Sequence, residues 1–262
     1  MDSHLVDAYL DRTGAARPAA ADAAALRDLH LRHQLAVPFE NLSIHLGQDI
    51  ALDASALAEK IIGGRGGFCY ELNGAFAELL GALGYRVTLL AARVYGDGGR
   101  PGPPYDHLAL RVEAADGSGP WLADVGFGRH AHYPLRLDSR ADQRDPGGVF
   151  RLDETAEGDL RVLRDGRPQY LLDTRPRRLS DFEATCWWQR TSPKSHFRQS
   201  LVCSLLTGRG RVTLSGRKLV LTEDERREEY DLRDGGEVLA AYREHFGITL
   251  EREPVVAPLG AP

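Results

Sequence analysis

The chain has 262 residues, of which 42% are hydrophobic and 27% charged, and it carries a formal net charge of −5. This composition is typical of a globular protein with a substantial core. The acidic balance excludes the overall electrostatic attraction on which nonspecific binding to nucleic acid or anionic membranes depends.

Cysteine content and hydrophobic patterning narrow the class further. Cys69, Cys186 and Cys203 are an odd number without zinc-ligand spacing, so we expect neither a disulfide framework nor a metal site. The N-terminus carries acidic residues, and no segment approaches the roughly 20 apolar residues of a membrane span. We therefore predict a cytoplasmic protein.

The first third of the chain, up to Gly84, is predicted to be helical. Apolar residues recur at helical spacing, and Asp53 is placed to cap a helix. The expected helices cover Leu5–Leu10, Ala23–Leu35, Leu57–Ile62 and Cys69–Leu83.

After Gly84 the hydrophobic period changes to two, which indicates strands. Turn signals at Glu157-Gly158 and Asp165-Gly166 separate the later ones. The pattern predicts a barrel or curled sheet built from Tyr85–Val94, His107–Glu113, Trp121–Val125, Val149–Leu152, Leu160–Leu163 and Gln169–Leu172.

The last third is predicted to be mixed. Ser180–Glu183 has the form of a capping box that starts a helix. A hairpin is expected to join Arg211–Leu214 to Lys218–Leu221 through Ser215-Gly216, and Gly236–Phe246 shows helical spacing. The whole chain is thus expected to be an α+β protein.

Cys69 is the most informative residue. It follows a glycine-rich loop and begins an apolar helix in the segment Arg65–Asn73 (RGGFCYELN). Unpaired N–H groups and the positive end of the helix dipole favour a thiolate at such a position, and the glycines leave room for a substrate. The pattern predicts a nucleophile.

A nucleophilic thiol needs a base, and the base needs an orienting partner. His107 opens one predicted strand and Asp124 ends the next, so the two could meet at one end of an antiparallel pair. The same residues also have structural interpretations: Cys69 as a packed thiol, His107 as a strand-edge residue and Asp124 as a turn former. His30 and His33 have metal-ligand spacing on a helix, but the sequence offers no third ligand nearby.

With these residues in view, the sequence resembles the bacterial arylamine N-acetyltransferase family. The matching motifs occur in the family's order and span roughly Leu5 to Phe197, whereas the tail from Val202 has no sharp motif. They are Val37–Leu42 (VPFENL), Arg65–Asn73, Asp106–Leu108, Ala123–Gly128 (ADVGFG) and Thr191–Phe197 (TSPKSHF).

The resemblance implies three parts: a helical bundle over 1–84 that carries the cysteine, a β-barrel over 85–179 that carries the histidine and aspartate, and an α/β lid over 180–262. It implies a cysteine-protease-like Cys-His-Asp core of Cys69, His107 and Asp124. The thiol would take an acetyl group from acetyl-coenzyme A and pass it to an arylamine or arylhydrazine in a ping-pong reaction without a metal.

Other roles follow from the same resemblance. An aromatic acceptor would contact side chains in the matched motifs and on a neighbouring strand, and glycines after Asp124 would lie near the cofactor phosphates. Arg65 and Glu40 are expected to form an ion pair beside the site. The expected acceptor residues are Phe39, Tyr70, Val94, Phe127 and Phe197, and the expected coenzyme A residues are Gly126 and Gly128.

Three alternatives remain at this stage. An amide synthase of the same family would use the thiol for a long acyl thioester and ignore acetyl-coenzyme A. A cysteine hydrolase would use the same three side chains with water as acceptor. A binding module would keep Cys69 as an inert buried thiol.

Overall fold

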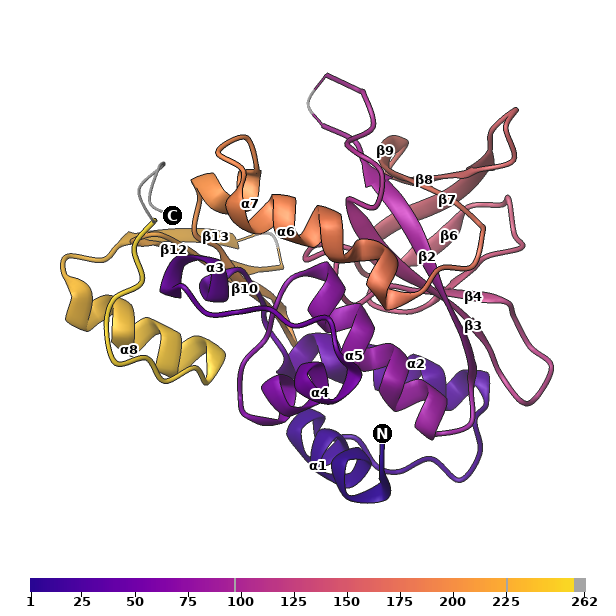
Figure 1. Ribbon diagram of the computed structural model, residues 1–262, viewed down its shortest axis with the longest axis horizontal. Coiled ribbons are helices and arrows are strands. Elements are labelled where there is room, and N and C mark those ends of the chain that lie inside the picture. Colours follow the sequence, from indigo (N-terminus) through magenta and orange to yellow (C-terminus); the bar gives the residue numbers. More distant parts are fainter. Residues whose placement is uncertain (97, 225, 257–262) are drawn as a thin grey trace.

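The computed structural model describes residues 1–96, 98–224 and 226–256. Within these residues, no helix has both the length and the apolar character that a membrane crossing requires. Helices and strands are both abundant, and the helices of the first third pack beside a curled sheet (Figure 1).

The first third contains the expected helices and two elements that were not predicted. Aspartates at positions 2, 22 and 53 cap three of the helices by accepting hydrogen bonds from first-turn N–H groups. The short helix α3 and the two-residue strand β1 (Phe39–Glu40) are additional. The helices are α1 (Ser3–Thr13), α2 (Ala23–Ala36), α3 (Leu42–Leu46), α4 (Ala54–Ile62) and α5 (Cys69–Ala82).

The predicted curled sheet has eight strands in the order β5-β4-β3-β2-β9-β8-β7-β6, and all the neighbours are antiparallel. The Gln143 side chain in β6 accepts from the Arg136 N–H and donates to its carbonyl in β5, so it links the two edges of a nearly closed barrel. The strands are β2 (Arg86–Val94), β3 (His107–Glu113), β4 (Trp121–Ala123), β5 (Leu135–Arg136), β6 (Gln143–Asp145), β7 (Gly148–Glu154), β8 (Leu160–Arg164) and β9 (Arg167–Leu172).

One strand end differs from the prediction in a way that matters for the site. Strand β4 ends at Ala123 rather than at Val125, because the N–H groups of the next two residues bond to side chains instead of a neighbouring strand. Asp124 therefore lies in the loop that leaves the sheet.

A second sheet of five strands has the order β1-β10-β11-β12-β13. The predicted hairpin is present as β11 and β12, although its turn is Gly216-Arg217 rather than Ser215-Gly216. Residue pairs Phe39–Ser204 and Glu40–Cys203 join β1 to β10, which ties the helical third to the last third. The later strands are β10 (Cys203–Thr207), β11 (Gly210–Ser215), β12 (Lys218–Glu223) and β13 (Arg226–Asp231).

The last third also holds a 3-10 turn η1 (Leu179–Phe182) and helices α6 (Glu183–Thr191), α7 (His196–Gln199) and α8 (Gly235–Phe246). The predicted capping box is wrong by two residues: the Asp181 carboxylate accepts from the Arg178 N–H, and Ser180 lies inside the turn. In Figure 1, α6 and α7 run between the barrel-like sheet and the C-terminal sheet, above α5.

Buried apolar side chains within the described residues form four clusters. One lies between the first helices and the barrel-like sheet, one inside that sheet, and one between α8 and the C-terminal sheet. The fourth surrounds Cys69 and includes Phe68, Leu108 and Phe182. Elements from all thirds of the chain thus meet at the start of α5.

Candidate active site

Cys69 is the first residue of α5, and only 3% of it is exposed. Phe68 precedes it in an extended conformation, and its N–H donates to the Glu71 carboxylate at 3.2 Å. Lys60 of α4 forms an ion pair with the same carboxylate. The helix start that presents the thiol is therefore fixed by a buried carboxylate.

His107 and Asp124 meet at the end of the barrel-like sheet. His107 Nε2 lies 2.7 Å from Asp124 Oδ2, and both side chains are buried. Since Nε2 is occupied by this contact, Nδ1 is the ring nitrogen that remains for another partner.

Asn73, one turn after Cys69, holds the other side of Asp124. Its Nδ2 donates to Asp124 Oδ1 at 2.9 Å and to the Leu108 carbonyl at 2.6 Å, while its Oδ1 accepts from the Val125 N–H at 2.9 Å. The Gly126 N–H donates to the same Asp124 oxygen at 3.1 Å. Helix α5 and the Asp124 loop are thereby locked together.

These partners set the charge state of Asp124. Burial raises the pKa of a carboxyl group, but the adjacent His107 and the hydrogen bonds from His107 and Asn73 bring the pKa of Asp124 well below its usual range. The carboxylate is therefore ionised and can stabilise a positive charge on His107.

His30 supports the same loop from α2. Its Nε2 accepts from the Asp124 N–H at 3.1 Å, so Nδ1 carries the proton and donates to the His132 carbonyl at 2.9 Å. Burial lowers the pKa of His30, which keeps the ring neutral. Both ring nitrogens of His30 form hydrogen bonds with backbone groups. His30 therefore has a structural role here, rather than the metal-binding role considered for it with His33.

Gly126 allows the Asp124 loop to touch the helix start. A methyl group at Gly126 would lie 2.8 Å from Cys69 Cα and 3.0 Å from its carbonyl oxygen. Gly128 has a φ of +85° and faces the Phe39 ring, which a methyl group would approach to 3.4 Å. Close packing thus gives each glycine a structural reason, beside the expected contact with coenzyme A.

Two effects act in opposite directions on ionisation of the Cys69 thiol: the helix start favours it and burial opposes it. Burial raises the pKa of Cys69, and the nearby carboxylates of Asp106 and Asp124 act in the same direction. Its Sγ lies 3.9 Å from the Asp106 carbonyl oxygen. Burial therefore opposes ionisation of the thiol, and a base that accepts its proton would offset this effect.

Three of the four predicted aromatic residues are partly exposed, and the fourth, Tyr70, is buried. The Phe127 ring lies 5.2 Å from the His107 ring, and the Phe197 ring lies 6.1 Å from Phe39. Tyr70 is fully buried, and its hydroxyl donates to the Tyr105 carbonyl at 2.8 Å, so it is part of the core beneath the site. Val94 ends β2 opposite Tyr170.

One buried chain of hydrogen bonds was not predicted. The Ser195 hydroxyl donates to Gln189 Oε1 at 2.6 Å, and Gln189 Nε2 donates to the Asp106 carboxylate at 2.7 Å. It connects α6 and the segment before α7 to the residue that precedes His107. Asp106 and Ser195 both lie in matched motifs, so the motif boundaries were the only available signal.

The expected ion pair between Arg65 and Glu40 is confirmed. Arg65 Nε and Nη2 lie 3.1 Å and 2.9 Å from Glu40 Oε1, and the Glu40 side chain is fully buried. The second carboxylate oxygen accepts from the Leu42 N–H, so this pair fixes the turn that follows β1.

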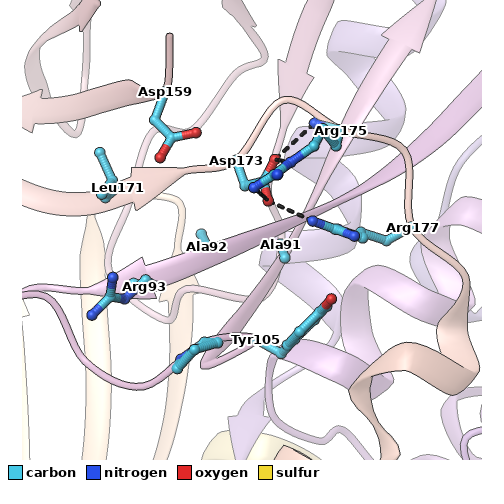
Figure 2. Close-up of a pocket in the computed structure, with 10 residues that line it drawn as sticks. Ala91, Ala92, Arg93, Tyr105, Asp159, Leu171, Asp173, Arg175 and Arg177 are labelled. Carbon is cyan, nitrogen blue, oxygen red and sulfur yellow. Dashed lines mark hydrogen bonds and ion pairs between the residues drawn. The ribbon is translucent and has the colours of Figure 1, made fainter. Parts of the chain in front are cut away.

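A cavity of about 310 Å³ lies beside β2, with Ala91, Arg93 and Tyr105 in its wall (Figure 2). Figure 2 shows the Asp173 carboxylate held by both Arg175 and Arg177 at one side of it. Its described lining includes none of the five residues expected to contact the acceptor. It is therefore distinct from the predicted acceptor pocket.

Comparison with known proteins identifies the family of this chain. A family model described as N-acetyltransferase matches residues 22–255. The chain belongs to the arylamine N-acetyltransferase family. Its members are enzymes, and the mixed helical and barrel-like architecture is that of their solved structures.

Individual members of the family are similar to this chain over most of their length. An arylamine N-acetyltransferase of Escherichia coli is 35% identical over 256 residues, which is 94% of this chain and 90% of the relative. An arylamine N-acetyltransferase / N-hydroxyarylamine O-acetyltransferase of Salmonella typhimurium is 39% identical over 73% of this chain and 69% of its own. The solved structure of Mycobacterium marinum arylamine N-acetyltransferase in complex with CoA has a TM-score of 0.83 and 34% identity, covering 93% and 92% of the two chains.

Proposed function

We propose that this protein transfers an acetyl group from acetyl-coenzyme A to the nitrogen of arylamines or arylhydrazines through an acetyl-Cys69 intermediate. The observation that carries the proposal is the buried His107–Asp124 hydrogen bond beside a cysteine at a helix start. A relative solved with CoA supports the choice of donor.

In the first half-reaction, His107 acts as the base. Nδ1 accepts the Cys69 proton, and the thiolate attacks the thioester carbonyl to form a tetrahedral intermediate. The backbone N–H of Cys69, at the start of α5, would stabilise the oxyanion. When the carbon–sulfur bond to coenzyme A breaks, the imidazolium returns the proton to the departing thiolate.

In the second half-reaction, the amine nitrogen attacks the acetyl-cysteine carbonyl. His107 removes the proton from this nitrogen and returns it to Sγ as the bond between carbon and Cys69 breaks. Asp124 holds the imidazole in the required orientation and stabilises its positive charge in both halves. The products are coenzyme A and the N-acetylated amine, and the enzyme returns to its thiol form.

The acceptor is proposed to bind against the aromatic residues beside His107. Phe127 contacts the His107 ring, and Phe39 with Phe197 supplies flat apolar surface that suits an aryl group. Tyr70 packs against Phe68, which contacts Phe197, and Val94 lies at the end of β2, the strand next to β3. Gly126 and Gly128 would let the loop backbone approach coenzyme A.

The decisive experiment incubates the protein with acetyl-coenzyme A and follows free thiol release and protein mass. We expect one acetyl group on Cys69, stable until an arylamine is added, and no adduct in Cys69→Ser. Cys186→Ala and Cys203→Ala serve as controls, because both buried thiols lie outside the proposed machinery. An adduct on another cysteine would refute the assignment.

The same experiment separates the alternatives. An amide synthase would leave acetyl-coenzyme A untouched and accept a long acyl thioester. A hydrolase would lose its acetyl group to water at a similar rate with or without amine.

A further inference from the structure

Three arginines converge on the loop that follows Asp124. Arg129 lies in this loop, and Arg164 of β8 donates from Nη1 to its carbonyl at 3.4 Å. Arg211 of β11 approaches from the second sheet. The barrel-like sheet and the C-terminal sheet thus each contribute one guanidinium beside the loop.

Contacts on the other side of the loop fix the position of Arg211. Its Nη1 donates to the Ser204 hydroxyl at 3.0 Å, and Ser204 pairs with Phe39 across β10 and β1. The Phe39 ring is the neighbour of Gly128. Arg211 is therefore tied, through Ser204 and Phe39, to the residue that precedes Arg129.

The charge of this cluster is not balanced by the protein. Across residues 1–96, 98–224 and 226–256, no carboxylate lies within 4.0 Å of the Arg129 or Arg211 guanidinium, and Arg164 pairs only with Asp165, at 3.6 Å. The Asp145 carboxylate lies near enough to act on Arg164 as Asp165 does, so two negative charges face three guanidinium groups within the described residues. The cluster therefore carries surplus positive charge.

Burial makes this surplus unfavourable in the free protein. It lowers the pKa of Arg211 to about 10, and repulsion from Arg129 and Arg164 acts in the same direction. The pKa of Arg164 is also lowered by burial and by Arg129. Like charges gathered in a partly buried place are stabilised when an anion binds among them.

We propose that Arg129, Arg164 and Arg211 bind the phosphate groups of coenzyme A. The planar guanidinium group suits phosphate oxygens, and the elongated shape of coenzyme A separates its phosphates from its thioester. The loop that carries Arg129 also carries Phe127, whose ring contacts His107. Phosphates held at the cluster would therefore direct the other end of the cofactor toward Cys69.

This inference rests on the proposed acetyl transfer, so its test compares two acetyl donors. Acetyl-coenzyme A carries the phosphates, whereas p-nitrophenyl acetate is an activated acetyl ester without any. We expect Arg129→Ala, Arg164→Gln and Arg211→Gln each to lower kcat/KM for acetyl-coenzyme A by about tenfold or more. The loss with p-nitrophenyl acetate should be much smaller.

Two further measurements sharpen the result. The wild-type kcat/KM for acetyl-coenzyme A should fall as salt is added, and the slope should be shallower in the variants. Arg151→Ala, a half-exposed arginine on β7 with its own aspartate partners, is the matched control and should retain both the rate and the slope. If Arg211→Gln fails to fold, the exposed Arg129 decides the question.

Equal losses with both donors, or unchanged kinetics in the Arg129 and Arg164 variants, would overturn the phosphate site and leave acetyl transfer intact. A wild-type protein that acetylates Cys69 with p-nitrophenyl acetate but not with acetyl-coenzyme A would instead overturn the proposed donor, and this inference with it.

Discussion

The carboxylates around the start of α5 and those of strand β13 show how differently one chemical group can be used. Glu40, Glu71 and Asp124 are buried, and each accepts from at least two partners supplied by different segments. Every residue of β13 is exposed, and Glu229 pairs with exposed cations. The buried carboxylates hold the segments that donate to them in fixed positions. The exposed carboxylates can lose a partner because water replaces it.

The physical reason is the cost of removing a charge from water. A buried carboxylate that loses a partner keeps the full desolvation cost, whereas an exposed one is solvated again. Substitutions near α5 should therefore change activity or stability strongly, and substitutions in β13 should change neither.

The largest effect is expected for Asp124→Asn. One face of the new amide would point an NH₂ group at a hydrogen-bond donor, because the carboxylate now accepts from His107 on one side and from Asn73 and Gly126 on the other. We expect kcat/KM for acetyl transfer to fall on the order of 10³–10⁴-fold. Thermal unfolding measured alongside must show a folded protein, and near-wild-type turnover in a folded variant would remove Asp124 from the mechanism.

Breaking the buried pair beside the site should act mainly on stability. Arg65→Met leaves the fully buried Glu40 carboxylate without its cation, and we expect the free energy of unfolding to fall by about 3–5 kcal/mol. Urea denaturation gives this value. The double variant Arg65→Met/Glu40→Gln should recover part of the loss, and a single variant as stable as wild type would show that the pair is dispensable.

A smaller effect is expected where the loop touches the helix. Gly126→Ala would place a methyl group against the Cys69 backbone and the Asn73 amide, at a cost of about 1–3 kcal/mol and with lower activity. The control is Gly81→Ala on the open face of α5, where nothing lies within 4 Å. It should be neutral or stabilising by up to about 1 kcal/mol.

Buried histidines should make the protein sensitive to mild acid. Burial lowers the pKa of His33 to about 3 and of His130 to about 4, compared with about 6.5 when unfolded. As pH falls below about 6.5 the unfolded chain binds protons that the folded chain refuses, so stability is lost by up to about 1.4 kcal/mol per pH unit for each ring.

Urea denaturation between pH 7.5 and 5 measures this slope. His33→Phe should flatten this slope because it removes the titrating imidazole. Phenylalanine keeps an aromatic ring between Tyr9 and Phe76. The same change at the exposed His4 is the control. A slope unaffected by His33→Phe would exclude the histidine as a source.

The same contrast explains which features the sequence could reveal. Local signals were enough for the Asp53 cap, the helix that starts at Cys69 and the β11–β12 hairpin. The meeting of His107 with Asp124 followed from the antiparallel pairing of consecutive strands. Each of these features depends on residues that are close in the sequence or on consecutive elements, so local sequence patterns are enough to predict it.

The missed features depend on long-range contacts. Strand β1 pairs with β10 and also forms a bridge to Gly67, and His30 and Gln189 gain partners from loops far away in the chain. Strand β13 has no apolar face, so its charged sequence lacks the alternating pattern that predicts a strand. The sequence shows the helix start that favours a Cys69 thiolate but does not show the burial that opposes it.

The smallest effect is expected in β13 itself. Arg227 and Glu229 form an ion pair in the exposed strand, and the rest of the strand is held by its backbone pairing with β12. Arg227→Ala should leave the midpoint of thermal unfolding and the acetyl-transfer rate within experimental error of wild type, because water replaces the lost partner. This variant matches Arg65→Met in removing one arginine from one glutamate. A large loss of stability in Arg227→Ala would show that burial is not what separates the two regions.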